Sequence, residues 1–479
     1  MKVAVIGAGP AGITAGYELS KAVPEGRIKQ LDVYEISSSV GGLARSFSLW
    51  GQTVDLGPHR FFSNDKRINE LWLEVAGNNY DIIQRQTRIF YKNSFFDYPI
   101  KALNALTNLG FFEAARCVLS YGWQKIFPVK DDNTFESWVT RRFGKRLYQI
   151  FFKTYSEKLW GIKCTELDSD FASQRIKKLS LFEAIKNAIT QGRNNKHKTL
   201  VDQFAYPLDG TGSIYNRMAE VIEKNGGKVH LSKGVEKVMT SGRKVTGLIL
   251  TSGEEVKYDH IVSSMPISLL VTRLPETPYD IKEYANKLKF RNTILVYLKI
   301  NKTDLFTDQW LYIHSKELHT GRITNFRNWV PQLYGKDENT IICMEYWCNF
   351  EDPEWKYTDE EYINIGKEEF TKTGLLKDGD VLDGFVVRLP RCYPIYYKGY
   401  KEELKPVESY LRTIENLQVI GRYGAYKYNN QDHSIFMGLL AAENILENTE
   451  NDLWTINTDY EVYQESTIIT KTGLVTKED

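Results

Sequence analysis

The chain has 479 residues, of which 62 are basic and 61 acidic, so its formal net charge is +1. This balance gives no global field toward nucleic acid or an anionic membrane, and any anion site must be local. With 42% hydrophobic and 13% aromatic residues, the chain can bury a large core and divide into two or three domains. The composition therefore indicates a globular protein without a nucleic-acid partner.

The cysteines are scattered and form no CxxC pair: Cys117, Cys164, Cys343, Cys348 and Cys392. The first residues predict a strand rather than a signal peptide. Both features indicate a reducing compartment, and we expect the cytoplasm. No run approaches the roughly 20 apolar residues that span a bilayer. Residues 102–127 are fairly apolar but contain Glu113 and Arg116. They predict a packed helix pair, with a monotopic membrane face as the alternative.

The chain opens with "KVAVIGAGPAGITAGYEL", which predicts a strand, a tight turn and a helix. Gly7 permits the turn, Gly9 lets backbone approach a pyrophosphate, and Gly12 lets helix and strand pack closely. A second strand, "QLDVYEI", reaches Glu35, where a carboxylate bonds the ribose hydroxyls of an adenine dinucleotide. Together these features favour a dinucleotide site over a ligand-free glycine turn.

A second glycine pair follows in "GGLARS", with Gly41, Gly42 and Arg45. At this position the chain resembles the FAD-containing family of amine oxidases, protoporphyrinogen oxidase and UDP-galactopyranose mutase. The resemblance implies that the dinucleotide is FAD and that the pair and Arg45 hold its phosphates. It also implies that the backbone of Val235, in "GGKVHLSKGVEKVM", meets the adenine.

Several stretches resemble the mutase branch. "VDLGPHRFFSNDKRI" matches the histidine loop beside the flavin, with His59 as its histidine, although Arg60 replaces the usual aliphatic residue. "YSEKLWGIKCTELDSDFASQRI" matches a segment of the sugar-nucleotide pocket through Trp160 and Arg175. The alternatives are a hydrogen-bonded core histidine at 59 and a helix pair with Trp160 in its core.

Two further stretches match substrate-binding positions of the mutases. "GRITNFRNW" aligns Arg322 with a mobile-loop arginine that grips the diphosphate, the alternative being an exposed sheet arginine. "RCYPIYYKGY" aligns Tyr393 with a tyrosine that reaches the diphosphate, while the nearby Arg391 could be structural. "GTG" at 210–212 resembles the turn that returns the chain to the FAD domain.

The loop "GRYGAYKYNNQDHS" at 421–434 closely resembles the C-terminal signature of mutases. Arg422 can form a forked contact with a phosphate, and Tyr428 adds a neutral donor. The start of the following helix would aim backbone donors at the flavin, with small residues letting the helix approach the cofactor. A capped helix after a polar turn, with Asp432 or Ser434 as N-cap, is the alternative.

The expected fold is α/β, with a discontinuous Rossmann-like FAD-binding domain, a helical domain and an antiparallel β-sheet substrate domain. We assign 1–75, 201–275 and 391–448 to the FAD domain, 76–200 to the helical domain, 276–390 to the sheet and 449–479 to a tail. The predicted sheet strands are "NTILVYLKI", "WLYIHS", "RITNF" and "TIICMEYW".

The resemblance implies a flavin-dependent mutase that interconverts UDP-galactopyranose, or a related UDP-hexopyranose, with its furanose through a sugar adduct at N5 of reduced FAD. Its product would serve polysaccharide or glycan synthesis, and NAD(P)H would be the external reductant. The alternatives are an FAD-dependent oxidase or desaturase of the protoporphyrinogen oxidase or amine oxidase type, and a flavin-free nucleotide-binding protein. The sequence does not define the oligomeric state, and a homo-oligomer is compatible with it.

The implied roles fall into three sets. The candidate catalytic residues are His59, Arg175 and Arg322. The candidate substrate-binding residues are Trp160, Arg175, Arg322, Tyr393, Arg422 and Tyr428. The candidate cofactor-binding residues are Gly7, Gly9, Gly12, Glu35, Gly41, Gly42, Arg45, His59, Val235, Gly421, Arg422, Gln431, Asp432 and Ser434. No metal site is expected.

Overall fold

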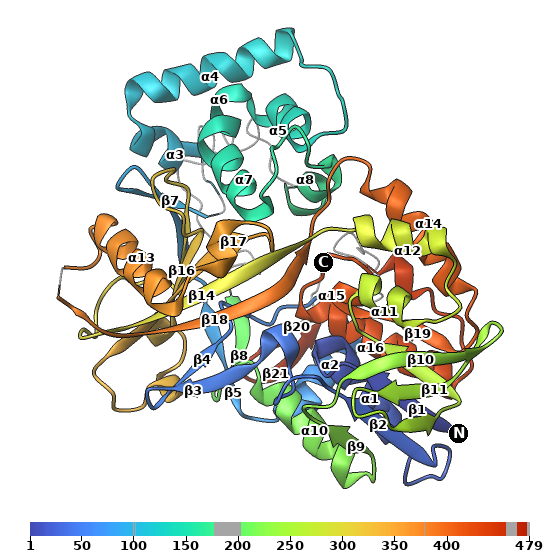
Figure 1. The fold of residues 1–479 in the computed structure, drawn as a ribbon. Helices are drawn as coiled ribbons and strands as arrows, with labels where there is room; N and C mark the ends of the chain where they lie inside the picture. Colours follow the sequence, from blue (N-terminus) through green and yellow to red (C-terminus); the bar gives the residue numbers. More distant parts are fainter. Residues whose placement is uncertain (99, 101, 177–202, 378, 457–466, 477–479) are drawn as a thin grey trace. The chain divides into compact units, whose positions relative to one another are not determined.

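The computed structural model describes residues 1–98, 100, 102–176, 203–377, 379–456 and 467–476. The chain separates into two compact units (Figure 1). The first comprises Met1–Ile82, Phe204–Lys289 and Tyr400–Asp479, and the second comprises Ile83–Gln203 and Phe290–Gly399. Each unit therefore combines segments that are distant in the sequence.

A parallel five-stranded sheet is the centre of the first unit, and its order is β19-β13-β1-β2-β9. Its strands are β1 (Lys2–Ile6), β2 (Gln30–Tyr34), β9 (Lys228–His230), β13 (His260–Ser263) and β19 (Leu417–Val419). Four consecutive residues of β1 are buried, as expected of a parallel strand covered on both faces. Their apolar run explains why the N-terminal segment takes the central position.

Helices of the first unit pack beside this sheet, and α1 (Pro10–Ser20) contacts both α10 (Ser213–Lys224) and α16 (Gln431–Leu446). The other helices are α2 (Lys66–Ala76), α11 (Ile267–Arg273), α12 (Tyr279–Lys287), α14 (Tyr400–Arg412), α15 (Gly421–Gly424), η1 (Gly42–Ala44) and η7 (Leu453–Thr455). The smaller sheets are formed by β3 (Ser46–Leu49) with β4 (Gln52–Asp55), β10 (Val235–Ser241) with β11 (Lys244–Leu250) and β12 (Glu255–Lys257), and β20 (Thr467–Thr470) with β21 (Gly473–Thr476). The two-stranded pair of β5 (Tyr80–Gln84) and β8 (Gln203–Pro207) lies where the chain passes between the units.

A seven-stranded sheet is the centre of the second unit, in the order β18-β14-β17-β16-β15-β6-β7. Its strands are β6 (Thr87–Tyr91), β7 (Ser94–Asp97), β14 (Phe290–Ile300), β15 (Trp310–Ile313), β16 (Arg322–Asn325), β17 (Thr340–Cys348) and β18 (Val381–Pro394). All neighbours are antiparallel except β15 and β6. Every residue of β17 is buried, which fits its position between β14 and β16.

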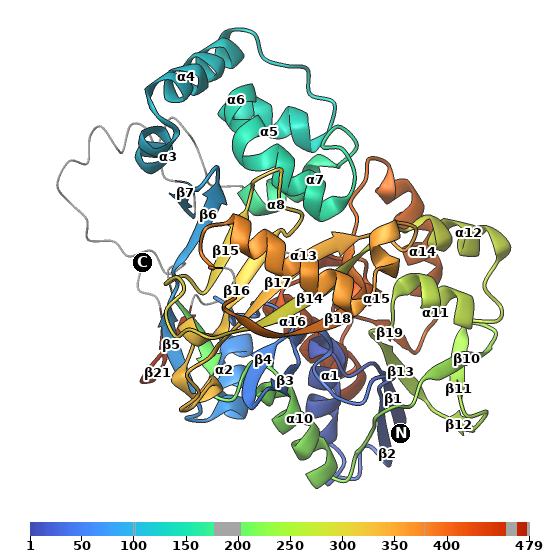
Figure 2. The same ribbon diagram turned by 60° about the vertical axis from the view of Figure 1, so that its left-hand side comes forward.

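The second unit has two sets of helices: one follows β7 and precedes β14 in the chain, and the other lies between β16 and β18. The first set is α3 (Ala102–Leu109), α4 (Phe111–Ile126), α5 (Phe135–Phe143), α6 (Lys145–Leu147), the π-helix η2 (Tyr148–Lys153), α7 (Thr154–Trp160) and α8 (Ser169–Ile176). The second set is α13 (Asp359–Lys372), η4 (Phe326–Asn328), η5 (Pro331–Leu333) and η6 (Pro353–Lys356). Helix α13 lies along β14 and β18, as Figure 2 shows.

The expected α/β fold class is confirmed, and the four predicted sheet strands are β14 to β17. The domain boundaries differ from those expected. Because β6 hydrogen-bonds to β15, the predicted helical and sheet regions share one unit. Residues 391–399 lie with the sheet as well, since β18 continues to Pro394 beside β14.

The residues after Leu446, expected to be a tail, include structure that packs on the first unit. The β20–β21 hairpin contacts α2, and Asn69 donates to the carbonyl of Thr467 over 3.2 Å. Tyr80 donates to the carbonyl of Thr470 over 2.7 Å, and Ile469 belongs to the core. The polar composition of this segment hides the short strand "TIIT", in which Thr467 and Ile469 are buried.

Helix packing in the first unit gives a direct prediction at Gly438. A Cβ there would overlap the carbonyl oxygen of Ala11 in α1, whereas a Cβ at Gly122 of α4 would meet no atom within 4 Å. Both are interior helix glycines, so alanine gains up to about 1 kcal/mol of helix propensity at each site. We expect Gly122→Ala to raise the melting temperature and Gly438→Ala to lower it and reduce bound flavin. Equal effects of the two substitutions in a thermal melt would contradict this packing.

Candidate functional site

The turn between β1 and α1 has the geometry that its glycines predict. Gly7 has φ +90° and donates its N–H to the carbonyl of Tyr34 over 2.8 Å. A Cβ at Gly12 would overlap the carbonyl oxygen of Gly7, so helix and strand need this glycine to approach. At Gly9 the nearest atom to such a Cβ is Cα of Gly42, at 3.8 Å. Packing therefore does not require Gly9, which fits a turn kept open for a pyrophosphate.

Glu35 follows β2 and is anchored from two sides. Its Oε2 accepts a hydrogen bond from the backbone N–H of Ala8 at 2.7 Å. Its Oε1 accepts from the N–H and hydroxyl of Ser37 at 2.9 and 2.8 Å. A carboxylate has about four acceptor positions, so these bonds fix its orientation and leave capacity for a ribose hydroxyl.

The second glycine pair packs against the first glycine turn. Gly41 has φ +96° and donates to the carbonyl of Ala8 over 2.8 Å, while a Cβ at Gly42 would meet Cα of Gly9 at 3.0 Å. Arg45 follows directly in extended conformation and is half-buried. Val235 begins β10 with 2% exposure and pairs with Leu250, so its backbone is held in place.

These residues fit an FAD site in the first unit. Two glycine turns lie in contact, and Gly9 caps α1 without a side-chain hydrogen bond, so the positive end of the helix dipole is not covered by a cap side chain. The anchored carboxylate of Glu35 suits the ribose, and the half-buried Arg45 supplies positive charge. The phosphates would therefore meet backbone donors and one guanidinium.

Asp55 organises the neighbouring turns, and the sequence analysis did not identify it. Its Oδ1 accepts from the hydroxyl of Ser46 at 2.5 Å and from the N–H of Thr211 at 3.2 Å. Its Oδ2 accepts from the hydroxyl of Tyr206 at 2.7 Å. Complete burial raises the pKa of Asp55 to about 6, although these donors oppose the rise. The feature of the sequence that could have identified it is a single acid at the end of an apolar stretch, in "VDLG", where it is the last residue of β4.

The histidine loop is tied to this network and to α16. The hydroxyl of Thr211 donates to the carbonyl of His59 over 2.9 Å, so the "GTG" turn holds the loop. Gln431 donates to the carbonyl of Arg60 over 3.2 Å and accepts from the hydroxyl of Tyr215 at 2.5 Å. The structure thus brings His59, the 210–212 turn and the start of α16 together.

The loop 421–434 lies against the first turn of α1. Gly421 has φ +81°, and a Cβ there would meet Cβ of Ala11 at 3.1 Å. One residue later, the guanidinium of Arg422 lies over the ring of Tyr428, 4.6 Å from its centroid. The two residues predicted to bind a diphosphate are therefore close to each other and near the dinucleotide turn.

Helix α16 begins at Gln431, and its N-cap Asn430 makes no side-chain capping bond. Asp432 and Ser434 are buried inside the first turn, and Asp432 Oδ1 lies 2.9 Å from Nδ1 of His433. The alternative with Asp432 or Ser434 as N-cap is therefore wrong. Gly438, one of the small residues of this helix, packs on the backbone of α1.

In the second unit, Arg322 is paired with an acid that the sequence analysis missed. Its Nε and Nη2 donate to Oε1 and Oε2 of Glu345 over 2.5 and 2.6 Å. Burial lowers the pKa of Arg322, but the Glu345 carboxylate outweighs burial and holds that pKa well above its usual value. Glu345 is the one charged residue in the buried run "TIICMEYW", and such a residue needs a partner.

The other predicted substrate residues of this unit fall into different environments. Trp160 has 0% exposure, and its ring packs edge-on against Phe171 and Tyr393, with centroids 4.8 and 6.2 Å away. It is therefore a core residue that supports Tyr393. Tyr393 is half-buried on β18, opposite Arg291. Arg175 lies in α8, and its side chain is outside the described residues.

Two cations near this cluster, the buried Arg291 and the half-buried Lys158, fix α7 to the sheet. Arg291 donates to the carbonyl of Trp347 over 2.8 Å and lies 3.1 Å from Asp352. Lys158 directs its ammonium at the carbonyls of four residues between 2.7 and 3.2 Å away, namely Ile313, Ser315, Leu318 and Thr320. These bonds hold the segment that precedes Arg322.

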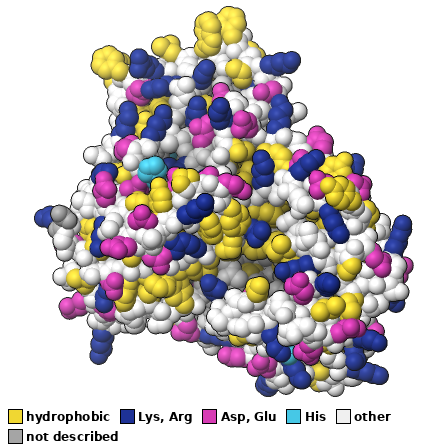
Figure 3. Space-filling model, in the orientation of Figure 1, with side chains coloured by type: hydrophobic (Ala, Val, Ile, Leu, Met, Phe, Trp, Pro, Cys, Tyr) yellow, Lys and Arg dark blue, Asp and Glu magenta, His cyan; other side chains and the backbone are white. Residues whose placement is uncertain are grey.

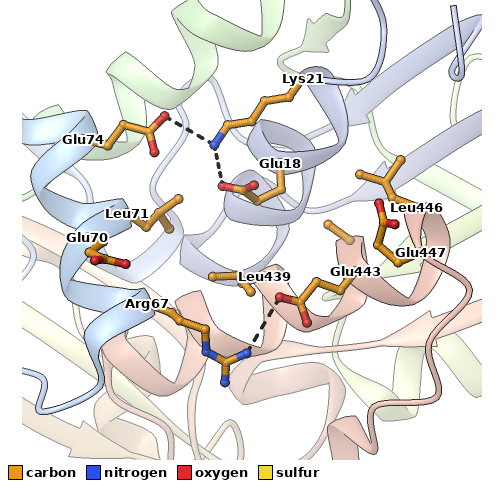
Figure 4. A pocket seen from close by; sticks show the side chains of 11 residues that line it. Glu18, Lys21, Arg67, Glu70, Leu71, Glu74, Leu439, Glu443, Leu446 and Glu447 are labelled. Carbon is orange, nitrogen blue, oxygen red and sulfur yellow. Dashed lines mark hydrogen bonds and ion pairs between the residues drawn. The ribbon is translucent and has the colours of Figure 1, made fainter. Parts of the chain in front are cut away.

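One shallow pocket of about 400 Å³ lies on the first unit between α1, α2 and α16 (Figure 4). Lys21 contacts Glu18 and Glu74 at 3.1 and 3.3 Å, and Arg67 lies 3.8 Å from Glu443. Its lining contains none of the predicted site residues. Because acids outnumber bases there, the pocket does not suit a diphosphate.

None of the helices among the described residues combines the length and apolar character needed to cross a bilayer. Five cysteines are free and buried.

A family model for flavin-containing amine oxidoreductases matches residues 10–446, and the chain belongs to that family. It is 21% identical to coproporphyrinogen III oxidase of Staphylococcus aureus over 93% of this chain and 98% of that protein. It is 22% identical to 4,4'-diapophytoene desaturase of Methylomonas sp. over 63% of this chain and 61% of that protein. Its fold is similar to that of reduced UDP-galactopyranose mutase, with a TM-score of 0.81, 23% identity, and coverage of 94% and 96%.

The second unit also gives a pH prediction at His314, whose ring stacks on Tyr155 at 4.9 Å. Complete burial, followed by the charge of Lys158, lowers the pKa of His314 to about 3. The unfolded chain binds a proton at this ring near pH 6.5, whereas the folded chain binds it only near pH 3. The free energy of unfolding therefore decreases as the pH falls from 6.5 toward 3. The loss approaches about 1.4 kcal/mol per pH unit. We expect the melting temperature of His314→Gln to fall less steeply with decreasing pH than that of wild type. The control His319→Gln, at an exposed histidine, should follow the wild-type profile. Parallel profiles of melting temperature against pH for the two variants would contradict this role of His314.

Proposed function

We propose that the protein is an FAD-dependent mutase that interconverts a UDP-hexopyranose, such as UDP-galactopyranose, with its furanose form. The observation that carries this proposal is the Arg422–Tyr428 pair beside the first turn of α1. A guanidinium and a phenol near the dinucleotide turn suit a second diphosphate better than an apolar substrate. The fold similarity to reduced UDP-galactopyranose mutase supports it.

In this proposal, bound FAD in its reduced form would supply the nucleophile that acts on the sugar, and the reaction has no net redox change. The side chains would hold the UDP leaving group. In the first unit, Arg422 would contribute charge and Tyr428 a neutral donor. Arg322 and Tyr393 stay candidate diphosphate-binding residues of the second unit by themselves. Retention of UDP matters because the sugar must recombine with it after the ring has changed.

The backbone around His59 would complete the cofactor environment. Thr211 holds the carbonyl of His59, and Gln431 holds that of Arg60, so the loop is fixed from two elements. A fixed loop suits orientation of the flavin more than proton transfer. His59 is accordingly proposed as a positioning residue.

The test is turnover of UDP-galactofuranose. Holoenzyme is reduced with dithionite without oxygen, the sugar nucleotide is added, and UDP-galactopyranose is measured by chromatography. Product from reduced but not oxidised enzyme is expected. Absence of product in both redox states would overturn the proposal.

A second candidate is an oxidase or desaturase, and the Glu345 contact favours it. A bidentate carboxylate neutralises Arg322 and so weakens its attraction for a diphosphate. The similarity to coproporphyrinogen III oxidase supports this candidate. Oxygen consumption with coproporphyrinogen III, and none with UDP-sugars, would select it.

Arg322→Lys tests the role of the guanidinium fork. Lysine keeps the charge beside Glu345 but cannot make the planar two-point contact. Arg322→Ala is less suitable, since an unpaired buried Glu345 costs about 3 to 5 kcal/mol. We expect Arg322→Lys to lower kcat/KM for the sugar nucleotide about tenfold or more with unchanged flavin content. Flavin loss, or unaltered turnover, would contradict the assignment.

Tyr428→Phe tests the loop in the first unit. The variant keeps the ring under Arg422 and removes the hydroxyl, whereas Tyr428→Ala removes both. We expect Tyr428→Phe to raise the Kd for UDP several-fold, which corresponds to about 1 kcal/mol for a lost hydrogen bond, and Tyr428→Ala to raise it further. Identical Kd values for wild type and both variants, measured by calorimetry, would remove this loop from the substrate site.

A further inference from the structure

Helix α4 of the second unit is turned with its apolar side outward. Five large apolar side chains are between 64% and 84% exposed: Phe111, Phe112, Leu119, Trp123 and Ile126. At 100° per residue they fall within about 120° of the helix circumference. Figure 3 shows hydrophobic side chains standing out over α4 at the top of the view. This is the reverse of an ordinary surface helix, which hides such a stripe.

The polar side of α4 faces the protein and fixes this orientation. Glu113 bonds the guanidinium of Arg146, and the N–H of Arg146 donates to the hydroxyl of Ser120 over 3.1 Å. Gln124 is buried on the same side, and a Cβ at Gly144 would lie 2.9 Å from the backbone of Tyr121. Rotation of the helix to bury its aromatic side would break these contacts. The outward stripe is therefore a built feature of the second unit.

Basic residues border the stripe on both sides. Arg116 is 72% exposed beside Trp123, and the exposed Lys125 lies at the opposite border. The apolar surface continues in Phe127 and Val129, and Lys130 follows them. The single acid of α4, Glu113, pairs with Arg146 and also lies 3.8 Å from Arg116, so the positive charges around α4 outnumber its one acid. The described residues of this face thus combine an apolar centre with positive edges.

The apolar centre and basic borders of this face favour one kind of partner. Two copies of α4 placed face to face would oppose positive borders with positive borders and find no acid on the stripe. An anionic lipid surface complements both the aromatic centre and the basic borders. We propose that α4 is an interfacial helix that docks the protein on anionic bilayers, with its exposed aromatic side chains entering the boundary between headgroups and acyl chains. This inference is independent of the substrate.

The test is sedimentation of the full-length holoenzyme with vesicles of phosphatidylcholine alone or with an equal share of phosphatidylglycerol. We expect wild type to sediment with the anionic vesicles and to prefer them at least tenfold. Phe112→Gln with Trp123→Gln should abolish binding, and Arg116→Gln with Lys125→Gln should remove the preference. The matched control is Tyr279→Gln with Leu382→Gln, two residues 78% and 53% exposed elsewhere, which should bind as wild type does.

Three outcomes would overturn the proposal. Wild type could stay in the supernatant with both kinds of vesicle. The control pair could lose binding as much as the α4 pair. Wild type could ignore vesicles but self-associate in analytical ultracentrifugation, with the Phe112→Gln and Trp123→Gln pair monomeric, which would assign the stripe to a second copy of the chain.

Discussion

Three segments of the chain pack closely against the first turn of α1, and the first unit depends on these close contacts. Gly7 and Gly12 let strand and helix meet, Gly421 brings the C-terminal loop to Ala11, and Gly438 lets α16 lie on the backbone of α1. A side chain at any of these positions would push apart elements that carry the cofactor residues. The same constraint places Arg422, which follows Gly421, near the dinucleotide turn.

Charge is handled differently in the two units. In the first, Glu35 is held by backbone and serine donors, and Asp55 gathers three donors while its burial raises its pKa. In the second, two half-buried cations are held by partners: Arg322 pairs with the buried Glu345, and Lys158 donates to backbone carbonyls. Backbone and hydroxyl donors tie Glu35 and Asp55 to specific turns. Because such turns are already fixed by hydrogen bonds, a ligand can bind there with little rearrangement of the backbone.

The sequence predicts those parts of the fold that depend on local spacing. The glycine turn, Glu35 and the four central sheet strands follow from neighbours in the chain, and the structure has these elements where they were expected. Long-range pairing could not be predicted in this way. Glu345 meets Arg322 because β16 and β17 are antiparallel in one register. The burial of Trp160 depends on Phe171 and Tyr393, and the orientation of α4 depends on Arg146.

The most direct measurement is a titration of the oxidised, flavin-loaded protein with UDP while the flavin absorbance is recorded. The central claim is that one chain binds FAD and also a second diphosphate, and that binding of the second diphosphate changes the absorbance of the flavin. A saturable spectral change with UDP, absent with uridine, is the predicted result. An unchanged spectrum with UDP, together with a saturable change on addition of a porphyrin, would contradict it.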